Sequence, residues 1–314
     1  MRQIRILTVF LNLMHKVSFY RVIKTIGIYL LIKITSYFKN EMVVSDIFSI
    51  KRIYNINDPA GFSSACGIRD LDELIFTRKL TADLSANIPL DNYIDIGSAI
   101  GYFTLPFAIQ VHKGGGVIHS FEPNPFNIEL QRKTLGMNGV TNIVLNNVGV
   151  ADTSGMKTFY YEKGFKGYLW GSFVLSNAYL PGTELESLKI KIITIDDYVT
   201  KNIFSDLSFI KMDTEGNEYP ILTGMEQTLN RFKPIIMMEM SLSRMVEFDD
   251  NRFLKTLELL KRHEYEIYVV NNNKLEKYYW PYQRVMNWFA IPKVGLNPNI
   301  DKVMSKHIRN GHRN

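Results

Sequence analysis

The chain has 314 residues, of which 46% are hydrophobic and 22% are charged, so it is long enough to bury a large core. A single cysteine, Cys66, excludes an intrachain disulfide and a metal site built from several cysteines. The six histidines form no His-x-x-x-His or His-Glu-x-x-His pattern, and we predict no metal site from them.

The formal net charge of +6 is concentrated at the N-terminus. Residues 1–40 contain seven Lys and Arg residues and no acid, which leaves 30 basic residues against 31 acidic ones in the rest of the chain. Because that remainder is close to neutral, overall charge gives little support to nucleic-acid binding, and we predict no nucleic-acid partner.

Residues 1–40 form a basic arm rich in Ile, Leu, Val and Phe. Its uncharged runs, residues 25–32 among them, are all far shorter than the roughly 20 residues that span a bilayer. Cations interrupt the apolar stretch and no small-x-small cleavage site follows, which disfavours a signal peptide. Two alternatives stay open: an amphipathic helix lying on an anionic membrane, and a helical pair packed on the main domain or on a partner subunit. We expect a cytoplasmic protein, with peripheral contact at the inner face of a membrane under the first alternative; the oligomeric state stays open.

The remaining elements follow in chain order. Residues 41–68 are predicted to be irregular, with a loop marked by Asp-Pro, Gly and Ser residues, and Leu and Ile at helical spacing predict a helix over 69–86. Strands are then predicted at 93–97, 116–123, 142–150, 207–213, 234–240, 265–271 and 285–293. Helices are predicted between them at 102–111, 124–139, 218–232 and 251–263. A polar, aromatic-rich section predicts two antiparallel strands at 157–163 and 188–195.

This alternation predicts an α/β fold with a doubly wound, mostly parallel, seven-stranded sheet. The domain boundaries that we predict are a basic helical arm and linker over 1–68, an α/β domain over 69–295 and a C-terminal tail over 296–314. The aromatic β insertion occupies about 156–195 of the domain.

The segment YIDIGSAIGYFTL, residues 93–105, joins a buried strand to a helix through a tight turn. Gly97 and Gly101 remove side chains where a ligand would approach the backbone. Glu122 ends the next strand, 21 residues after Gly101. In open α/β sheets ligands lie beyond the carboxyl ends of the strands, and an acid at that place accepts the hydroxyls of a ribose. The pattern therefore predicts a site for an adenosine-type ligand.

Two classes of cofactor contain an adenosine whose ribose would suit this site. Dinucleotides favour Gly-x-Gly-x-x-Gly, whereas this turn has only Gly97 and Gly101, and the carboxylate of Asp95 would repel a pyrophosphate. The same charge suits S-adenosyl-L-methionine, which carries an ammonium and a sulfonium. We predict S-adenosyl-L-methionine as the cofactor; an NAD-dependent oxidoreductase and a turn that binds nothing are the alternatives.

Several segments, in this order, resemble FkbM-type methyltransferases: DIGSAIGYFTL, VIHSFEPNPFNIELQ, NNVGVADTSG, ITIDDYV, FIKMDTEGNEYPILTGM and PIIMMEM. The resemblance covers about residues 90–240. It implies a Rossmann-like class I methyltransferase fold that uses S-adenosylmethionine, and usually methyl transfer to a hydroxyl oxygen. Together with the basic amphipathic arm, the resemblance favours a saccharide or a glycolipid precursor as the acceptor, with another hydroxylated small molecule as the broader class.

The resemblance assigns residues to the cofactor and to an acidic segment. The cofactor-binding residues that we expect are Asp95, Gly97, Ser98, Ala99, Gly101, Thr104, Glu122, Pro123 and Val148. The Asp-x-Glu-Gly-x-Glu segment comprises Asp213, Glu215, Gly216 and Glu218, and Ser172 loosely resembles a further family serine. The family commonly has Asn at the position of Ala99, so a weak or inactive methyltransferase-like binding protein is an alternative. Val148 would contact the adenine or the core.

Asp213 follows a strand expected to lie beside that of Asp95, and it is the first choice for a base or acceptor-positioning carboxylate. Glu215 on the following loop and Glu239 at the end of the next strand complete the catalytic set that we predict. Three acids there could instead hold a divalent cation. For Glu218 we favour helix capping, and for Lys211 pairing with an acid.

The stretch FYYEKGFKGYLWGSF, residues 159–173, is dense in aromatic residues. Aromatic faces stack on sugar rings, so the insertion could form a lid over the acceptor. Packing of a β-hairpin against the sheet is the equally weighted alternative.

Overall fold

The structure is a computed structural model. It describes residues 41–45, 50–55, 71–88, 91–162, 171–173, 184–214, 216–240, 252–278 and 287–309. The two proposals for the basic arm, and Cys66, lie outside these residues. The chain divides into two compact units. The smaller is Met1–Leu71 with Lys133–Gly139, and the larger contains the rest.

Within the smaller unit, strands β1 (Glu41–Ser45) and β2 (Lys51–Asn55) pair antiparallel where the sequence predicts an irregular loop. The carboxamide of Asn138 joins this hairpin to the end of helix α6 (Pro125–Asn138). It accepts from the Lys51 amide at 2.9 Å and donates to the Lys51 carbonyl at 2.7 Å. This pairing is a long-range contact, which a local sequence pattern does not reveal.

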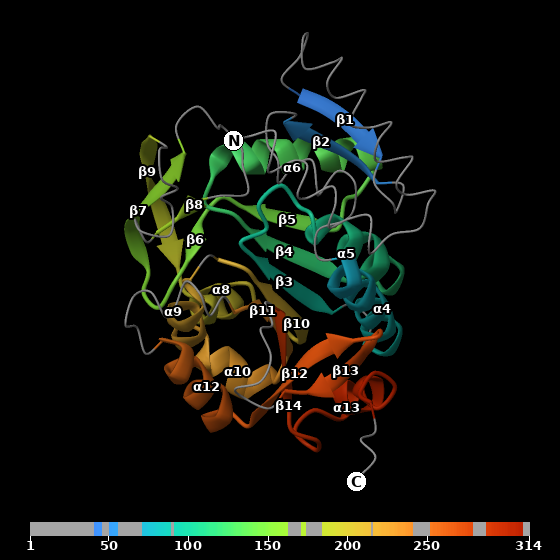
Figure 1. Cartoon of the computed structure of the whole chain (residues 1–314). Helices are drawn as coiled ribbons and strands as arrows, with labels where there is room; N and C mark the ends of the chain where they lie inside the picture. Colours follow the sequence, from blue (N-terminus) through green and yellow to red (C-terminus); the bar gives the residue numbers. More distant parts are fainter. Residues whose placement is uncertain are drawn as a thin grey trace, which may run out of the picture. The chain divides into compact units, whose positions relative to one another are not determined.

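The larger unit is built on one main sheet (Figure 1), whose strand order is β13-β12-β14-β11-β10-β3-β4-β5. The strands are β3 (Asn92–Ile96), β4 (Val117–Phe121), β5 (Ile143–Asn146), β10 (Leu207–Met212), β11 (Ile235–Glu239), β12 (Tyr265–Asn271), β13 (Lys274–Lys277) and β14 (Asn287–Pro292). The pairs from β5 to β11 are parallel, and β14 is antiparallel to both of its neighbours.

The expected doubly wound α/β sheet is confirmed, but the count of seven strands is wrong. The eighth strand, β13, returns along β12 after Asn272 and Asn273, whose φ angles are +49° and +57°. Two successive residues with positive φ form the tight turn of a two-residue hairpin. The polar composition of residues 274–277 conceals this edge strand from a pattern based on apolar residues.

Helices cover both faces of this sheet (Figure 1). On one face, α8 (Ile195–Lys201), α9 (Glu218–Thr223), α10 (Glu226–Phe232) and α12 (Arg252–Arg262) contribute to the largest apolar cluster. On the other face, Phe76 of α4 (Leu71–Asn87) packs edge-on against Phe289 of β14, and Phe107 of α5 (Thr104–Val111) against Phe209 of β10. All six residues of β10 are buried, as a strand covered on both faces requires.

The helix expected over 218–232 is interrupted next to Gly224, between α9 and α10. A β-carbon at Gly224 would lie 2.2 Å from the carbonyl oxygen of Ala151. The backbone of residue 151 therefore approaches at the point where α9 ends and α10 begins. In the same region the strand expected over 142–150 divides into β5 and β6 (Gly149–Val150).

The aromatic insertion forms a separate sheet with the order β6-β9-β7-β8. Strands β7 (Gly155–Glu162) and β9 (Leu185–Ile193) are antiparallel, which confirms the expected pairing, and β8 is Gly171–Ser172. Phe159, Tyr161 and Ile190 form a small core of their own.

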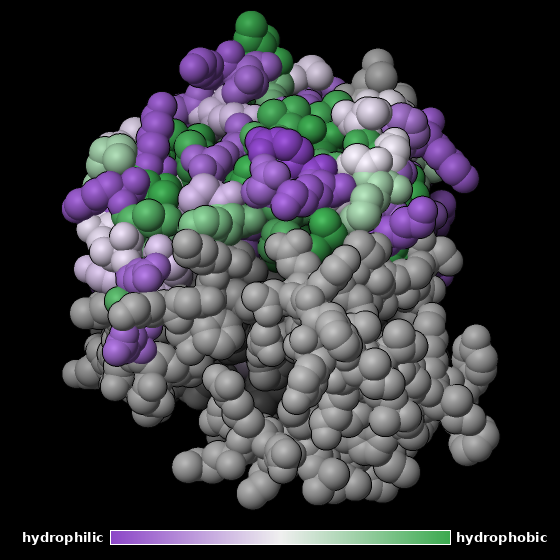
Figure 2. Space-filling view, turned by 90° about the horizontal axis from the view of Figure 1, so that it is seen from above, coloured by the Kyte–Doolittle hydropathy of each residue, from purple (hydrophilic) through white to green (hydrophobic). Residues whose placement is uncertain are grey.

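Residues 296–314, for which the sequence predicts a tail, contain helix α13 (Pro298–Met304). Asn297 caps this helix by accepting from the Ile300 amide at 3.3 Å, and Ile300 and Val303 are buried. None of the helices in the described part of the chain is long and apolar enough to cross a membrane. In Figure 2, hydrophilic and hydrophobic residues are interspersed over the described part of the face that it shows.

Candidate active site

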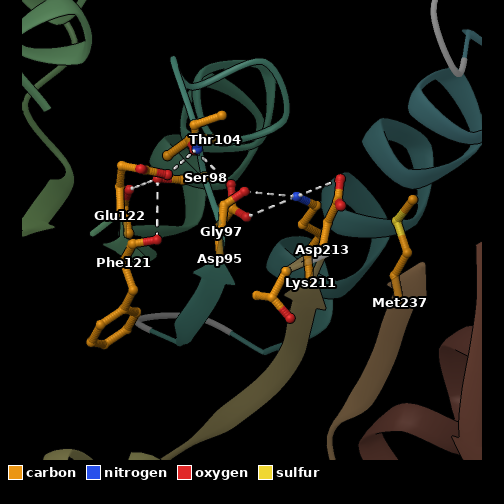
Figure 3. A network of polar contacts seen from close by, with 12 residues as sticks. Asp95, Gly97, Ser98, Thr104, Phe121, Glu122, Lys211, Asp213 and Met237 are labelled. Atoms are coloured by element: carbon orange, nitrogen blue, oxygen red, sulfur yellow. Dashed lines mark hydrogen bonds and ion pairs between the residues drawn. The ribbon is translucent and has the colours of Figure 1, made fainter. Parts of the chain in front are cut away.

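The sheet reverses its winding between β3 and β10. From β3 the chain proceeds outward to β4 and β5 on one side, and later to β10 and β11 on the other. The register pairs Lys211 with Asp95, so the expected adjacency of these two strands is confirmed. In open α/β sheets the ligand crevice lies at such a switch point, beyond the carboxyl ends of the strands. The residues at those ends therefore define the candidate site (Figure 3).

The turn after β3 is closed against the end of β10. Gly97 has a φ of +74°, and a β-carbon there would lie 1.9 Å from the carbonyl oxygen of Asp213. The amides of Gly97 and Ser98 donate to the Phe121 carbonyl at 2.9 and 3.2 Å. Gly101 has a φ of +84°, and a β-carbon there would lie 2.6 Å from Leu105. Both glycines are required by backbone geometry, whatever the turn binds.

Ala99 occupies the left-handed region with a φ of +48°. Its amide donates to Glu122 Oε2 at 2.8 Å, and its carbonyl accepts from Gln131 Nε2 at 2.6 Å. Hydrogen bonds to both the amide and the carbonyl of Ala99 hold this conformation, which is unfavourable for a residue with a β-carbon. Ala99 thus takes part in the site through its backbone.

Gln131 of α6 was missed by the sequence analysis. Besides Ala99, its amide contacts the Ser98 hydroxyl at 2.8 Å, and its side-chain oxygen accepts from Ser120 at 3.2 Å. Ser120 also donates to Ser98 at 2.7 Å. The available signal was a polar residue between Ile128 and Leu135 on the apolar face of α6, at helical spacing.

Glu122 lies directly after β4 and is 4% exposed. Its carboxylate accepts hydrogen bonds from the Ala99 amide, from the Asn124 amide at 2.8 Å and from the Asn127 side chain at 3.2 Å. Burial raises the pKa of Glu122 to about 7, against the lowering effect of these hydrogen bonds. A carboxylate has about four acceptor positions, so three donors leave capacity for a ligand hydroxyl.

Asp95 lies inside the wall of the site and is 1% exposed. Its Oδ2 accepts from the Thr104 hydroxyl at 2.6 Å, and its Oδ1 lies 3.5 Å from the Lys211 ammonium. Burial raises the pKa of Asp95, and Lys211 opposes that effect. Thr104 begins α5, so Asp95 ties the strand to the helix on either side of the turn.

Asp213 is the more accessible partner of Lys211. Its side chain is 28% exposed, and its Oδ2 lies 3.4 Å from the Lys211 ammonium. Its amide donates to the Ile96 carbonyl at 3.1 Å, which fixes the loop after β10 to the end of β3. The expected pairing of Lys211 with an acid is therefore confirmed twice, with Asp95 and with Asp213.

Glu218 begins α9, whose N-cap is Asn217, and it bonds the loop before the helix, not the helix amides that the expected capping requires. Its Oε1 accepts from the Thr214 amide at 3.0 Å, the Thr214 hydroxyl at 2.9 Å and the Gly216 amide at 3.3 Å, and it is 1% exposed. Gly216 has a φ of +98°, and its carbonyl accepts from Arg252 at 3.0 Å. Glu215 lies outside the described residues.

The other expected site residues lie on different elements of the fold. Glu239 ends β11 beside β10, and its charge contributes to raising the pKa of Lys211. The Pro123 carbonyl accepts from Asn147 at 3.0 Å. Val148 is half-buried and packs against the main core, as the core alternative expects. Its contact with the adenine stays a prediction. Ser172 is buried in the inserted sheet, opposite Tyr160.

Within the inserted sheet, the described aromatic residues pack on one another. The rings of Phe159 and Phe173 lie 5.3 Å apart, and β-carbons at Gly171 and Gly149 would collide with them. These contacts lie within the inserted sheet, so the lid and the packing of a hairpin against the main sheet both stay predictions. Phe165, Tyr168 and Trp170, on which the lid proposal also depends, lie outside the described residues. Among the residues that the structure does describe, no three His, Cys, Asp or Glu side chains form a group that could hold a metal ion.

Four carboxylates thus lie at the ends of four adjacent parallel strands: Asp95, Glu122, Asp213 and Glu239. The charge of Lys211 interacts with all four. Among the described residues, Lys211 is the cation within 4 Å of Asp95 and Asp213, and the four acids, when ionised, outnumber it in a largely buried setting. A cluster of this charge favours a ligand with positive charge and disfavours a phosphate.

The comparisons with known proteins agree with this chemistry at the level of family. A family model described as the methyltransferase FkbM domain matches residues 95–267. An FkbM methyltransferase structure from Methylobacillus flagellatus is 20% identical with a TM-score of 0.40, and the match covers 64% of this chain and 43% of that one. The M. jannaschii TYW2 structure in complex with AdoMet is 13% identical with a TM-score of 0.37, and 81% and 84% of the two chains are covered.

A curated relative, the tRNA wybutosine-synthesizing protein 2 homolog of Rattus norvegicus, is 47% identical over 47 residues. The match spans 15% of this chain and 10% of that protein. It contradicts the expectation that nucleic acid is no partner. That expectation rested on net charge, which bears on non-specific attraction and does not test which acceptor a catalytic crevice admits.

Proposed function

Because the chain belongs to the FkbM methyltransferase family, we propose that it transfers a methyl group from S-adenosyl-L-methionine to a hydroxyl oxygen. The acceptor that we propose is a saccharide, a glycolipid precursor or another small hydroxylated molecule. The observation that carries this proposal is the cluster of four carboxylates around the buried Lys211 at the switch point, two of them ion-paired with it.

S-adenosyl-L-methionine fits this cluster by charge. Its sulfonium and ammonium are positive, whereas a dinucleotide would bring a pyrophosphate beside Asp95 and Asp213. Glu122, at the end of the strand next to the glycine turn, is the residue that would accept the ribose hydroxyls. Gly97, Ser98, Ala99 and Gly101 would form the backbone wall against the cofactor.

When bound, the cofactor supplies an electrophilic methyl group on a positive sulfur, which leaves as a neutral thioether. Asp213 would accept the proton of the acceptor hydroxyl while the oxygen forms its bond to the methyl carbon. Its partial exposure and its ion pair with Lys211 suit a carboxylate held ionised at the mouth of the crevice. Much of the acceleration would come from holding acceptor and methyl group in line. Glu239 would help to orient the acceptor.

Two measurements test the proposal. Calorimetric titration with S-adenosylhomocysteine should give binding and titration with NAD should not; binding of NAD alone would sink the proposal. An Asp213→Asn variant should keep its affinity for S-adenosylhomocysteine within a few-fold and lose about 100-fold or more of its transfer rate, since a general base typically contributes 10²–10⁴-fold.

The acceptor class can be assigned with radiolabelled methyl donor. Separate pools of cell-envelope glycolipids, soluble small molecules and RNA are incubated with the protein, and labelled products are treated with base to distinguish methyl ethers from methyl esters. Stable label in the glycolipid or small-molecule pool supports the proposed acceptor. Label in RNA alone would replace it. Cofactor binding without methyl transfer to any pool would favour the alternative of an inactive binding protein. That alternative arises because Ala99 stands where the family commonly has Asn.

A further inference from the structure

Lys211 occupies the centre of the candidate site while being nearly inaccessible. Its residue is 4% exposed, and its ammonium lies 3.5 Å from Asp95 Oδ1 and 3.4 Å from Asp213 Oδ2. It also lies 3.3 Å from the Gly97 carbonyl and 5.2 Å from the centre of the Phe103 ring. Figure 3 shows the ammonium between the two carboxylates.

A buried ammonium is unfavourable unless nearby charges compensate for its lost hydration. Burial by itself lowers the pKa of Lys211, but Asp213, Asp95 and Glu239 together outweigh it and raise that pKa. Lys211 is therefore a permanent cation at neutral pH. It is too deeply buried, and too firmly protonated, to exchange a proton with an acceptor.

The contacts of Lys211 join two parts of the crevice that are distant in sequence. Asp95 on β3 and Gly97 in the turn after it belong to the part that we assign to the cofactor. Asp213 belongs to the loop after β10, which we assign to the acceptor. Parallel pairing places Lys211 beside Asp95 in register, so its side chain reaches both parts from a strand buried on both faces.

We propose that Lys211 is a positioning residue that holds the carboxylate of Asp213 ionised and oriented toward the acceptor while it fixes the cofactor turn through Asp95 and Gly97. This role rests on the proposed function, since it presumes that Asp213 serves the acceptor hydroxyl. The charge of Lys211 would therefore affect both the affinity for the cofactor and the ionisation of Asp213.

The charged groups around Asp213 determine what removal of Lys211 does. Asp95 on β3, Glu239 on β11 and, when it is ionised, Glu122 after β4 are negative, and all interact with Lys211. Arg252 on α12 contacts the carbonyl of Gly216, at the far part of the same loop. Without Lys211, Asp213 would lose the ion pair at 3.4 Å and would bind a proton more readily.

The test compares Lys211→Met, Lys211→Arg and the double variant Asp95→Asn/Lys211→Met. Wild type and Lys302→Met, which changes an exposed lysine on α13, are the controls. S-adenosylhomocysteine affinity is measured by calorimetry. The rate of methyl transfer from labelled S-adenosylmethionine to the acceptor pool labelled best by wild type is measured between pH 5.5 and 9.

In Lys211→Met, we expect the acidic limb of the rate profile to move to higher pH by about one unit, and S-adenosylhomocysteine affinity to fall about 10-fold. Lys211→Arg should restore the position of the limb, because it restores the charge. The double variant removes the unpaired buried Asp95, so it should fold and still show the shifted limb, since Asp213 still lacks its cation.

A limb unchanged in both Met variants would overturn the inference and leave Lys211 a structural residue. Failure of the double variant to fold would overturn it as well, because Lys211 would then be required for stability independently of Asp95. These outcomes differ from failure of the proposed function, in which wild type itself would bind no S-adenosylhomocysteine or transfer no label.

Discussion

The carbonyl oxygen of Asp213 lies only 1.9 Å from the position that a β-carbon on Gly97 would take. The cofactor turn and the loop carrying the base are thus packed backbone to backbone. Even the smallest side chain at residue 97 must push them apart.

Gly97→Ala should therefore abolish S-adenosylhomocysteine binding and lower the free energy of unfolding by several kcal/mol, since the φ of +74° adds strain to the collision. Urea denaturation and calorimetry measure the two effects. Gly136→Ala in α6 is the matched control, because nothing lies within 4 Å of its added β-carbon. It should be neutral or stabilising by up to about 1 kcal/mol. Equal behaviour of the two variants would contradict the packing described here.

Ala99 stores backbone strain in the same turn. Ala99→Gly should raise the free energy of unfolding by about 0.5–1 kcal/mol, because glycine adopts a φ of +48° without the steric cost of a β-carbon. Ala108→Gly in α5 is the opposite control and should destabilise by about 1 kcal/mol. Chemical denaturation checks both signs. Ala99→Asn, which tolerates positive φ, should keep the stability and tighten S-adenosylhomocysteine binding if a side-chain amide helps the cofactor.

Glu122 makes cofactor affinity depend on pH. Burial raises its pKa to about 7, so the carboxylate is mostly protonated at pH 6 and mostly ionised at pH 8. Because ribose hydroxyls donate best to the ionised form, S-adenosylhomocysteine affinity should rise up to about 10-fold between these pH values. Glu122→Gln should lose about 1–3 kcal/mol of binding free energy at pH 8 and should bind equally at both pH values. Identical pH profiles for the variant and wild type, measured by calorimetry, would refute the ribose assignment.

At the opposite end of β3, Asp91 forms a buried hydrogen bond with the hydroxyl of Ser208. Burial raises the pKa of Asp91 to about 7, above its ordinary value of 3.8. The folded state therefore holds a proton that the unfolded state has lost, and this contribution to stability decreases as the pH rises from about 4 to about 7.

Ser208→Ala should accordingly cost more at pH 8, where Asp91 is charged, than at pH 5.5. We expect about 2–3 kcal/mol against about 1 kcal/mol, measured by urea denaturation. Asp91→Asn should flatten the pH dependence of stability, and both variants should bind S-adenosylhomocysteine as wild type does. A penalty independent of pH would mean that Asp91 does not titrate in this range.

Much of the site could be predicted from local patterns. Gly97, Gly101 and Glu122 are found at the expected strand ends, because a turn that needs positive φ selects glycine and a parallel sheet places successive strand ends at one edge. Gln131 could not be assigned in this way, because its partners Ser98 and Ala99 lie 33 and 32 residues away. A polar residue on a helix does not by itself indicate which groups it bonds. The break at Gly224 is similar, because its cause is the backbone of Ala151.

The sequence by itself determined the alternation of strands and helices, the glycine turn and the row of acids at the strand ends, since these depend on short-range periodicity and on the chirality of parallel sheets. Only the tertiary structure decided how those acids are compensated. Lys211 and Asp95 are over 100 residues apart in the chain, and only the parallel register of β10 with β3 sets the ammonium between Asp95 and Asp213. Charges that interact over a few ångströms depend on that register.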